Sequence, residues 1–165
     1  MMTVLLDKQR HDRTRFDCGV VALDNYLRMM ASQQASKDNT RTFVLEDAEQ
    51  SGMVIGYYTL TMIQLDLVRL PVHLQKKHQS NHSAGLIARL AVDRRYVGKG
   101  YGEFLLVDAL SKLRQASEVV AFPLVVVDAK QGVAMFYKKM GFTPFLDEPD
   151  SLFMTMADIR RTLGV

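Results

Sequence analysis

The most informative segment of the chain reads Leu90-Ala91-Val92-Asp93-Arg94-Arg95-Tyr96-Val97-Gly98-Lys99-Gly100-Tyr101-Gly102. It lies between a predicted strand, 85–92, and a predicted helix, 100–117, whose leucines recur on one face. Glycines let a backbone approach an anion closely and turn its N–H groups inward. A helix start adds its positive end and unpaired N–H donors. The spacing Arg95-x-x-Gly98-x-Gly100 therefore predicts a cradle for a phosphate-bearing ligand.

Other glycine-rich patterns do not fit this segment. It lacks the spacing and the Gly-Lys-Ser/Thr ending of a P-loop, and the spacing of the Gly-x-Gly-x-x-Gly dinucleotide fingerprint. Three glycines within five residues could also form a merely flexible turn. The strand–turn–helix context and the basic flank favour an anion over that alternative.

A second informative segment, Ala134-Met135-Phe136-Tyr137-Lys138-Lys139-Met140-Gly141-Phe142, follows a near-continuous apolar strand, 123–127. Tyr137 falls late in the helix predicted for this segment. A tyrosine with a buried ring and a hydroxyl that opens into a cleft can act as a general acid. Taken alone, Tyr137 could equally be a core aromatic with a satisfied hydroxyl.

Together the two segments resemble the GNAT N-acetyltransferase family, whose cofactor is acetyl-CoA. The resemblance follows the element order from about Thr40 to Thr155 and implies a central mixed β-sheet with helices on both faces. It implies that Tyr137 is the catalytic residue that protonates the leaving thiolate. The residues that the resemblance assigns to the cofactor are Leu90, Ala91 and Val92 for the pantetheine arm, Arg95, Tyr96, Val97, Gly98, Lys99, Gly100, Tyr101 and Gly102 around the pyrophosphate, and Phe136 beside the thioester. Gln131 stands where many relatives have an Asn that contacts the cofactor, so that contact is in doubt.

A narrower resemblance is to the GNAT toxins of type II toxin–antitoxin modules. It is carried by Phe16-Asp17-Cys18-Gly19, by Leu23-Asp24-Asn25-Tyr26-Leu27 and by Arg89-Leu90-Ala91-Val92-Asp93. These toxins acetylate the α-amino group of aminoacyl-tRNA and so inhibit translation, and ribbon-helix-helix antitoxins neutralise them. The resemblance implies aminoacyl-tRNA as substrate and such an antitoxin as partner.

The chemistry of the acceptor amine agrees with the toxin reading. A lysine side chain, with a pKa of about 10.4, needs a strong base before it can attack a thioester, whereas an α-amino group near 8 needs little help. The predicted cofactor strand, 85–92, carries no Glu, Asp or His. Glu46, Asp93 or a water chain could still act as the base.

The distribution of charge points to a polyanionic substrate. The net charge is +3, yet residues 68–116 alone carry +6, and residues 143–158 hold four acids and no base. Phosphates dominate the affinity of proteins for nucleic acid. The candidate contacts to tRNA are Lys76, Lys77, Arg89 and Arg94. An unevenly charged, solvated surface is the alternative.

Two rival functions stay open. One is a housekeeping acetyltransferase of a small amine or a protein N-terminus, and the other is a non-catalytic module that binds CoA or RNA. The presence of Tyr137 and of the complete Arg95-x-x-Gly98-x-Gly100 pattern argues against the second. The oligomeric state is left open, with a homodimer as one option.

Length and composition are those of one globular domain, expected to span residues 1–165. One cysteine, no membrane-length apolar run and no secretory leader predict a cytoplasmic protein. The expected strands are 3–6, 40–46, 53–68, 85–92, 123–127, 142–145 and 151–155, of which the last two are expected to pair as a terminal hairpin. The expected helices are 18–36, a short one within 69–83, 100–117, 130–140 and 157–163. Asp17 is expected to cap the first of these helices, and Gly141 to end the helix 130–140. No metal site is expected, because His73, His78 and His82 are too widely spaced. Cys18 is interpreted as a small buried residue rather than a nucleophile.

Overall fold

The computed structural model describes residues 1–129 and 132–165. The described chain is α/β, with a seven-stranded mixed sheet of strand order β1-β2-β3-β4-β5-β7-β6 flanked by helices, so the predicted fold class is confirmed. The chain divides into two compact units. Unit 1 comprises Met1–Thr61 and Ala88–Ala109, and unit 2 comprises Met62–Ile87 and Leu110–Val165.

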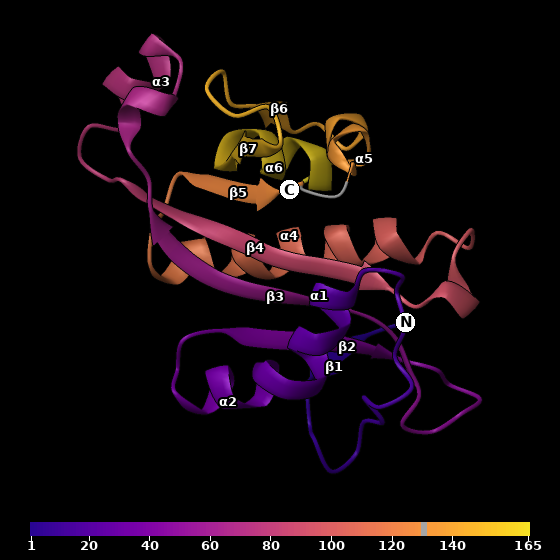
Figure 1. Ribbon diagram of the computed structural model, residues 1–165. Helices are drawn as coiled ribbons and strands as arrows, with labels where there is room; N and C mark the ends of the chain where they lie inside the picture. Colours follow the sequence, from indigo (N-terminus) through magenta and orange to yellow (C-terminus); the bar gives the residue numbers. More distant parts are fainter. Residues whose placement is uncertain (130–131) are drawn as a thin grey trace. The chain divides into compact units, whose positions relative to one another are not determined.

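Unit 1 contains an antiparallel meander and the first helical segment. Strands β1 (Thr3–Leu5), β2 (Arg41–Glu46) and β3 (Val54–Gln64) pair in sequence, with Thr3 opposite Leu45 and Arg41 opposite Leu60. Helix α2 lies against β2 (Figure 1). The remaining elements of this unit are α1 (Val21–Asn25), the π-helical turn η1 (Tyr26–Met30), α2 (Ala31–Ser36), the 3-10 turn η3 (Arg94–Tyr96) and the first part of α4 (Tyr101–Val119).

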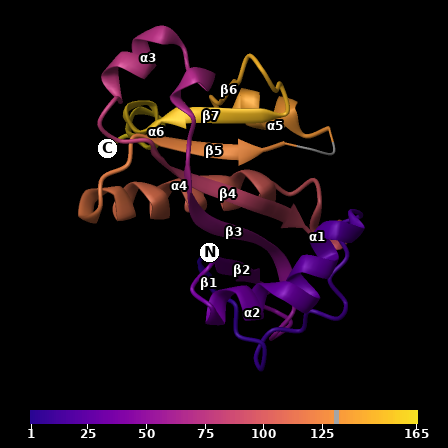
Figure 2. The same ribbon diagram turned by 60° about the vertical axis from the view of Figure 1, so that its left-hand side comes forward.

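Unit 2 is built around a buried parallel strand. Strand β4 (Ser83–Val92) begins here and pairs in parallel with β5 (Leu124–Asp128) over Ala84–Ile87, and β5 pairs antiparallel with β7 (Ser151–Thr155). Figure 2 shows β7 between β5 and β6 (Thr143–Pro144), with α6 (Met156–Leu163) continuing from β7. The other elements are the 3-10 turn η2 (Leu67–Arg69), α3 (Val72–Lys77) and α5 (Ala134–Lys139).

Each unit has its own apolar core. Apolar side chains are removed from water wherever a strand or helix turns one face inward, which supplies most of the driving force for folding. The core of unit 1 contains Phe16, Tyr26, Leu27, Ala31, Val44, Val54, Tyr57 and Ala91. The core of unit 2 contains Leu65, Leu70, Leu74, Ala84, Leu124, Val126, Phe145 and Phe153.

The first helix departs from the prediction of a continuous helix over 18–36. It starts at Val21, because Gly19 has a φ of 91° and Val20 is extended. The side chain of Asp17, predicted to cap the helix, instead accepts a hydrogen bond from the Gly19 N–H at 3.0 Å. Its middle turn, η1, is π-helical rather than α-helical.

Several other elements are also shorter than predicted. The strand predicted to reach residue 68 ends at Gln64, because Asp66 caps the turn η2 by accepting from the Val68 N–H. The helix predicted over 130–140 is described over Ala134–Lys139, and Gly141, with a φ of 103°, terminates it as predicted. The predicted terminal hairpin is confirmed as β6 paired with β7.

In the described part of the chain, no helix combines the length and the hydropathy of a membrane span.

Candidate active site

The loop that follows β4 is anchored by one buried carboxylate, Asp93. Its side chain is 1% exposed and accepts hydrogen bonds from the backbone N–H groups of Arg95, at 2.9 Å, and Asp17, at 3.0 Å. The Asp93 N–H donates to the Ile55 carbonyl at 2.8 Å. Burial acts to raise the pKa of Asp93, but hydrogen bonds from Arg95 and Asp17 outweigh it and hold the pKa below its ordinary value. Asp93 is therefore an anchor, and a poor candidate for the general base.

Arg95 lies on this anchor. Its guanidinium donates to both oxygens of Asp93, from Nε at 2.9 Å and from Nη2 at 2.8 Å. A bidentate pair of this kind has fixed geometry as well as opposite charges. The Arg95 side chain and backbone N–H thus both hold the shape of the turn, so its part in binding an anion is limited to its positive charge.

The glycines of the turn leave space beside the backbone. Gly98 has a φ of 78° and Gly100 a φ of 84°, a conformation that L-residues rarely adopt. A Cβ built on either glycine would meet no atom within 4 Å. Helix α4 begins directly afterwards at Tyr101. The turn therefore offers an open surface of backbone next to a helix N-terminus, as an anion cradle requires.

The N-terminal segment Phe16–Gly19 lies against the same loop. Besides the bond from Asp17 N–H to Asp93, the Arg94 N–H donates to the Asp17 carbonyl at 2.9 Å. The Arg94 guanidinium pairs with the Asp17 carboxylate at 3.2 Å, with both side chains exposed. The two segments that carry the toxin resemblance and the cofactor resemblance are thus joined in the structure.

Three further contacts around β4 and the turn that follows it were not predicted from the sequence. Gly56 on β3 allows a close approach, since a Cβ there would lie 2.7 Å from the Ala91 carbonyl oxygen. A glycine inside a strand often marks such a close approach, so Gly56 was a usable signal in the sequence. The Arg89 guanidinium lies 3.6 Å from the centre of the Tyr26 ring, in a cation–π contact. The Tyr96 hydroxyl donates to Asp47 at 2.6 Å, a tether across 49 residues that no local signal indicates.

Tyr137, in unit 2, combines a buried ring with a hydroxyl that no described residue binds. It is 4% exposed, and its ring makes edge contacts with Phe136 and Phe142 at 5.1 and 5.7 Å between centroids. No hydrogen bond to its hydroxyl occurs within residues 1–129 and 132–165, whereas the buried Tyr57 donates to the Leu23 carbonyl at 2.6 Å. Burial, followed by the Asp128 carboxylate, raises the pKa of Tyr137 to about 12. It is therefore protonated at neutral pH, as a general acid must be.

Two other candidate groups are disfavoured by their surroundings. Glu46 accepts a hydrogen bond from the Gly52 N–H at 2.9 Å and pairs with Arg10 at 2.6 Å, and these contacts, the first above all, keep its pKa below the ordinary value. It is thus a weak base. Burial, reinforced by Asp24, raises the pKa of the half-buried Cys18 thiol to about 11, which disfavours it as a nucleophile.

The predicted site residues fall into three groups. Unit 1 holds the cradle residues 95–102, the strand residues Leu90, Ala91 and Val92, and the basic residues Arg89 and Arg94. Unit 2 holds Phe136 and Tyr137 on α5, and Lys76 and Lys77 in the last turn of α3. Gln131 lies outside the described residues. Within those residues there is no cluster of three or more His, Cys, Asp or Glu that could hold a metal ion.

Replacing Asp93 with Asn is expected to destabilise the protein by about 1–3 kcal/mol, because the amide cannot accept from all the donors that meet the carboxylate. Since its pKa is lowered in the folded state, Asp93 contributes its full stabilisation above about pH 4 and loses it as the pH falls through that lowered pKa. Urea unfolding of both proteins should therefore give curves that converge in acid. The exposed Asp38→Asn is the control, with a change below about 0.5 kcal/mol. An equal effect of the two substitutions would contradict the anchoring role.

Over most of its length, the chain is similar to proteins that are named as toxins. The "Probable toxin TacT" of Sinorhizobium fredii is 29% identical over 170 residues, which cover 96% of this chain and 93% of the relative. A "tRNA-acetylating toxin" of Mycobacterium tuberculosis is 30% identical, with 93% and 91% covered. Among solved structures, AtaT complexed with acetyl-methionyl-tRNAfMet has a TM-score of 0.88 and 27% identity, with 98% of both chains covered.

The family assignment rests on a match that covers residues 38–144. Residues 38–144 match the acetyltransferase (GNAT) domain, a span that runs from just before β2 through β6 and includes both the glycine turn and Tyr137. The fold expected from the resemblance agrees with the observed strand order and with the solved relative. Because the matched span exceeds half of the chain, the protein belongs to the GNAT acetyltransferase family.

Proposed function

We propose that this protein is an acetyl-CoA-dependent N-acetyltransferase toxin that acetylates the α-amino group of aminoacyl-tRNA and thereby blocks translation. The observation that carries the proposal is the open turn at Gly98 and Gly100, held by Asp93 and followed at once by α4. Similarity over more than nine-tenths of the chain to a tRNA-acetylating toxin supports the choice of acceptor. The protein would act in the cytoplasm, where charged tRNA is found.

The residues present fit acetyl-CoA. The backbone of 97–102 would hold the pyrophosphate, because positive-φ glycines expose N–H groups and leave room for an anion, and Arg95 would add its positive charge. Leu90, Ala91 and Val92 would lie along the pantetheine arm through their backbone. Bound there, acetyl-CoA supplies the acetyl group as a reactive thioester.

The protein's own groups would supply the rest of the chemistry. The Val92 N–H is the candidate donor to the oxyanion, a contribution of about 3–4 kcal/mol in comparable sites. Tyr137 holds its proton at Oη, and we assign it the role of returning a proton to the leaving sulfur. Since Asp93 and Glu46 are engaged by hydrogen bonds and ion pairs, the amine would react without a strong base. An α-amino group, with a pKa near 8, permits that.

A toxin of this kind would be held inactive by an antitoxin. We propose a small ribbon-helix-helix antitoxin as the protein partner. Co-expression with the protein encoded by a short neighbouring reading frame should then restore growth and yield a stable complex on size exclusion.

The decisive experiment combines expression with an acceptor survey. Expression of the wild-type chain should arrest growth, and expression of Tyr137→Phe should not. With radiolabelled acetyl-CoA and a full set of charged tRNAs, label should appear on the esterified amino acid and be absent from uncharged tRNA and free amino acids. The rate should fall steeply with added salt, because phosphate contacts release counterions. Harmless expression, together with efficient acetylation of small amines or peptides and none of charged tRNA, would contradict the proposal in favour of a housekeeping enzyme.

A further inference from the structure

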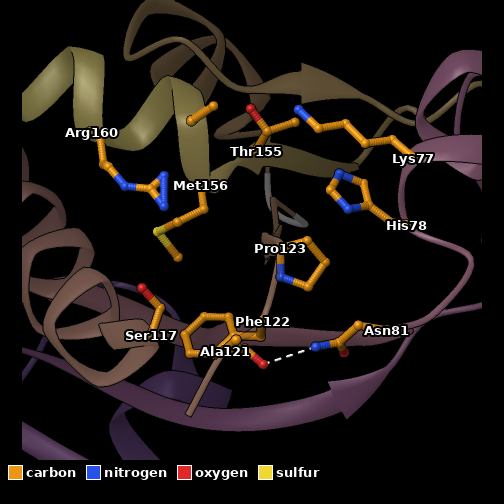
Figure 3. Close-up of a pocket in the computed structure, with 11 residues that line it drawn as sticks. Lys77, His78, Asn81, Ser117, Ala121, Phe122, Pro123, Thr155, Met156 and Arg160 are labelled. Atoms are coloured by element: carbon orange, nitrogen blue, oxygen red, sulfur yellow. Dashed lines mark hydrogen bonds between the residues drawn. The ribbon is translucent and has the colours of Figure 1, made fainter. Parts of the chain in front are cut away.

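Unit 2 contains a cavity that no part of the proposed acetyl transfer uses. Its volume is about 350 Å³, and it is bounded by the end of α3, the last turns of α4, the segment leading into β5 and the first turns of α6. Figure 3 shows Lys77 and His78 directed toward it from the end of α3, and Arg160 from α6. The volume lies at the lower end of the range for small-molecule sites, roughly 300–1,000 Å³, which suits one nucleotide-sized group.

The charge of this cavity is of one sign. Lys77, His78 and Arg160 line it, and among the described residues that line it there is no Asp or Glu. Within residues 1–129 and 132–165, the side chains of Lys77 and Arg160 form no ion pair, in contrast to the neighbouring Arg161, which pairs with Asp158 at 2.9 Å. Burial, followed by the charge of Lys77, lowers the pKa of His78, so the charge at neutral pH comes from Lys77 and Arg160. Two cations without an acidic partner in one cavity favour an anionic ligand.

The rest of the lining combines the polar residues Asn81, Ser117 and Thr155 with apolar ones. The side chains of Phe122, Pro123 and Met156 form its apolar wall, and Figure 3 shows all three. Asn81 fixes that wall from the side, because its amide donates to the Ala121 carbonyl at 2.9 Å and its oxygen accepts from the Ser83 N–H at 3.0 Å. The cavity therefore presents apolar side chains beside its two cations.

The cavity is remote from Tyr137 within the same unit. The cavity lies at the start of β5, next to Pro123. Tyr137 belongs to α5, the helix that follows the end of β5, and the Asp128 carboxylate at that end contributes to raising its pKa. Five strand residues at about 3.3 Å each separate the two ends by roughly 15 Å. A small amine at the catalytic tyrosine would not reach this cavity, but an extended polyanion would.

We infer that this cavity is a docking site for a nucleotide of the RNA substrate, with Lys77 and Arg160 on its phosphate and the Phe122–Met156 wall against its base or sugar. The inference rests on the proposed function and adds to it a second point of contact with tRNA. A nucleotide satisfies both the cations and the apolar wall, since it joins a phosphate to a ring system. A carboxylate side chain of an acidic peptide would satisfy the cations alone.

The experiment compares adjacent arginines that differ in whether they line the cavity. Arg160→Ala and Lys77→Ala are each expected to raise the Kd for fluorescein-labelled, deacylated tRNA about tenfold, the effect of losing a charged hydrogen bond. Each should also make the slope of log Kd against log salt shallower by about one. The matched controls Arg161→Ala and Lys37→Ala remove the same charges outside the cavity, and should change Kd by less than about twofold.

Two further measurements complete the test. The first distinguishes RNA from CoA as the source of the nucleotide, and the second distinguishes a failure of the docking site from a failure of the proposed function. Calorimetry of acetyl-CoA binding should be the same for Arg160→Ala and wild type, because CoA also carries a nucleotide phosphate. A parallel loss of acetyl-CoA affinity would overturn the assignment to RNA. Equal effects of Arg160→Ala and Arg161→Ala, in a wild-type background that acetylates charged tRNA, would overturn the docking site alone. A wild-type protein that neither binds nor acetylates tRNA would overturn the proposed function with it.

Discussion

Tyr137→Phe is expected to lower the rate of acetyl transfer by about 10²–10⁴, the usual contribution of a positioned general acid. The substitution keeps the ring and its edge contacts with Phe136 and Phe142. Because no described residue hydrogen-bonds to the hydroxyl, its removal should change the free energy of unfolding by less than about 1.5 kcal/mol. Steady-state kinetics with urea unfolding on the same preparations would measure both quantities. The KM for acetyl-CoA should stay close to its wild-type value.

The control for this prediction is Tyr58→Phe. The Tyr58 hydroxyl is buried and donates to Asp108 at 2.5 Å, so its loss should reduce stability by about 1–2 kcal/mol and leave the rate unchanged. The two tyrosines should thus give opposite patterns. Full activity in Tyr137→Phe would instead make Tyr137 a core aromatic with no role in the chemistry.

Gly100→Glu is expected to abolish acetyl-CoA binding in a protein that still folds. A Cβ at this position meets no protein atom within 4 Å, so the new side chain would extend into the cradle and place a negative charge where the pyrophosphate is assigned. The φ of 84° adds strain of about 1–3 kcal/mol, which a folded domain of this size can tolerate. Isothermal calorimetry would measure binding, and circular dichroism would verify the fold.

Gly164→Glu is a matched control for strain, because Gly164 has a φ of 74° and equally open surroundings at the end of α6. It should bind acetyl-CoA as the wild type does. Gly100→Ala separates strain from charge, and should weaken binding less than Gly100→Glu. An unchanged Kd in a folded Gly100→Glu protein would remove the cradle assignment.

Much of the fold was predictable because its signals are local. These signals are the apolar run of β5, the leucine stripe of α4 and the glycine after α5. Each can be recognised from residues that lie within a few positions of one another in the sequence. The predictions were wrong where a polar contact or a distant residue determined the local backbone conformation. Helix α1 starts late because the backbone at Gly19 turns, and the Asp17 carboxylate expected to cap the helix is engaged by Gly19 and Arg94.

Within the candidate site, the backbone conformation of the glycine turn was predictable. The glycine turn was located because glycine is required by backbone conformation, and Gly98 and Gly100 both have positive φ. The side-chain role of Arg95 was not predictable, since its partner could have been a ligand as well as the adjacent Asp93. The burial of Asp93 explains why Arg95 pairs with it. A buried carboxylate requires hydrogen-bond donors, and Arg95 and Asp17 supply them.

Short patterns of residue types were sufficient to predict the fold class, to locate the glycine turn and to select Tyr137 as the candidate general acid. Tertiary structure alone decided which distant groups meet: Asp17 with Asp93, Tyr96 with Asp47, and Lys77 with Arg160 around one cavity. The physical reason is that hydrogen bonds and charges act over a few ångströms in space, while the partners are separated by 49 to 83 residues of chain. Propensity and periodicity carry no information across such separations.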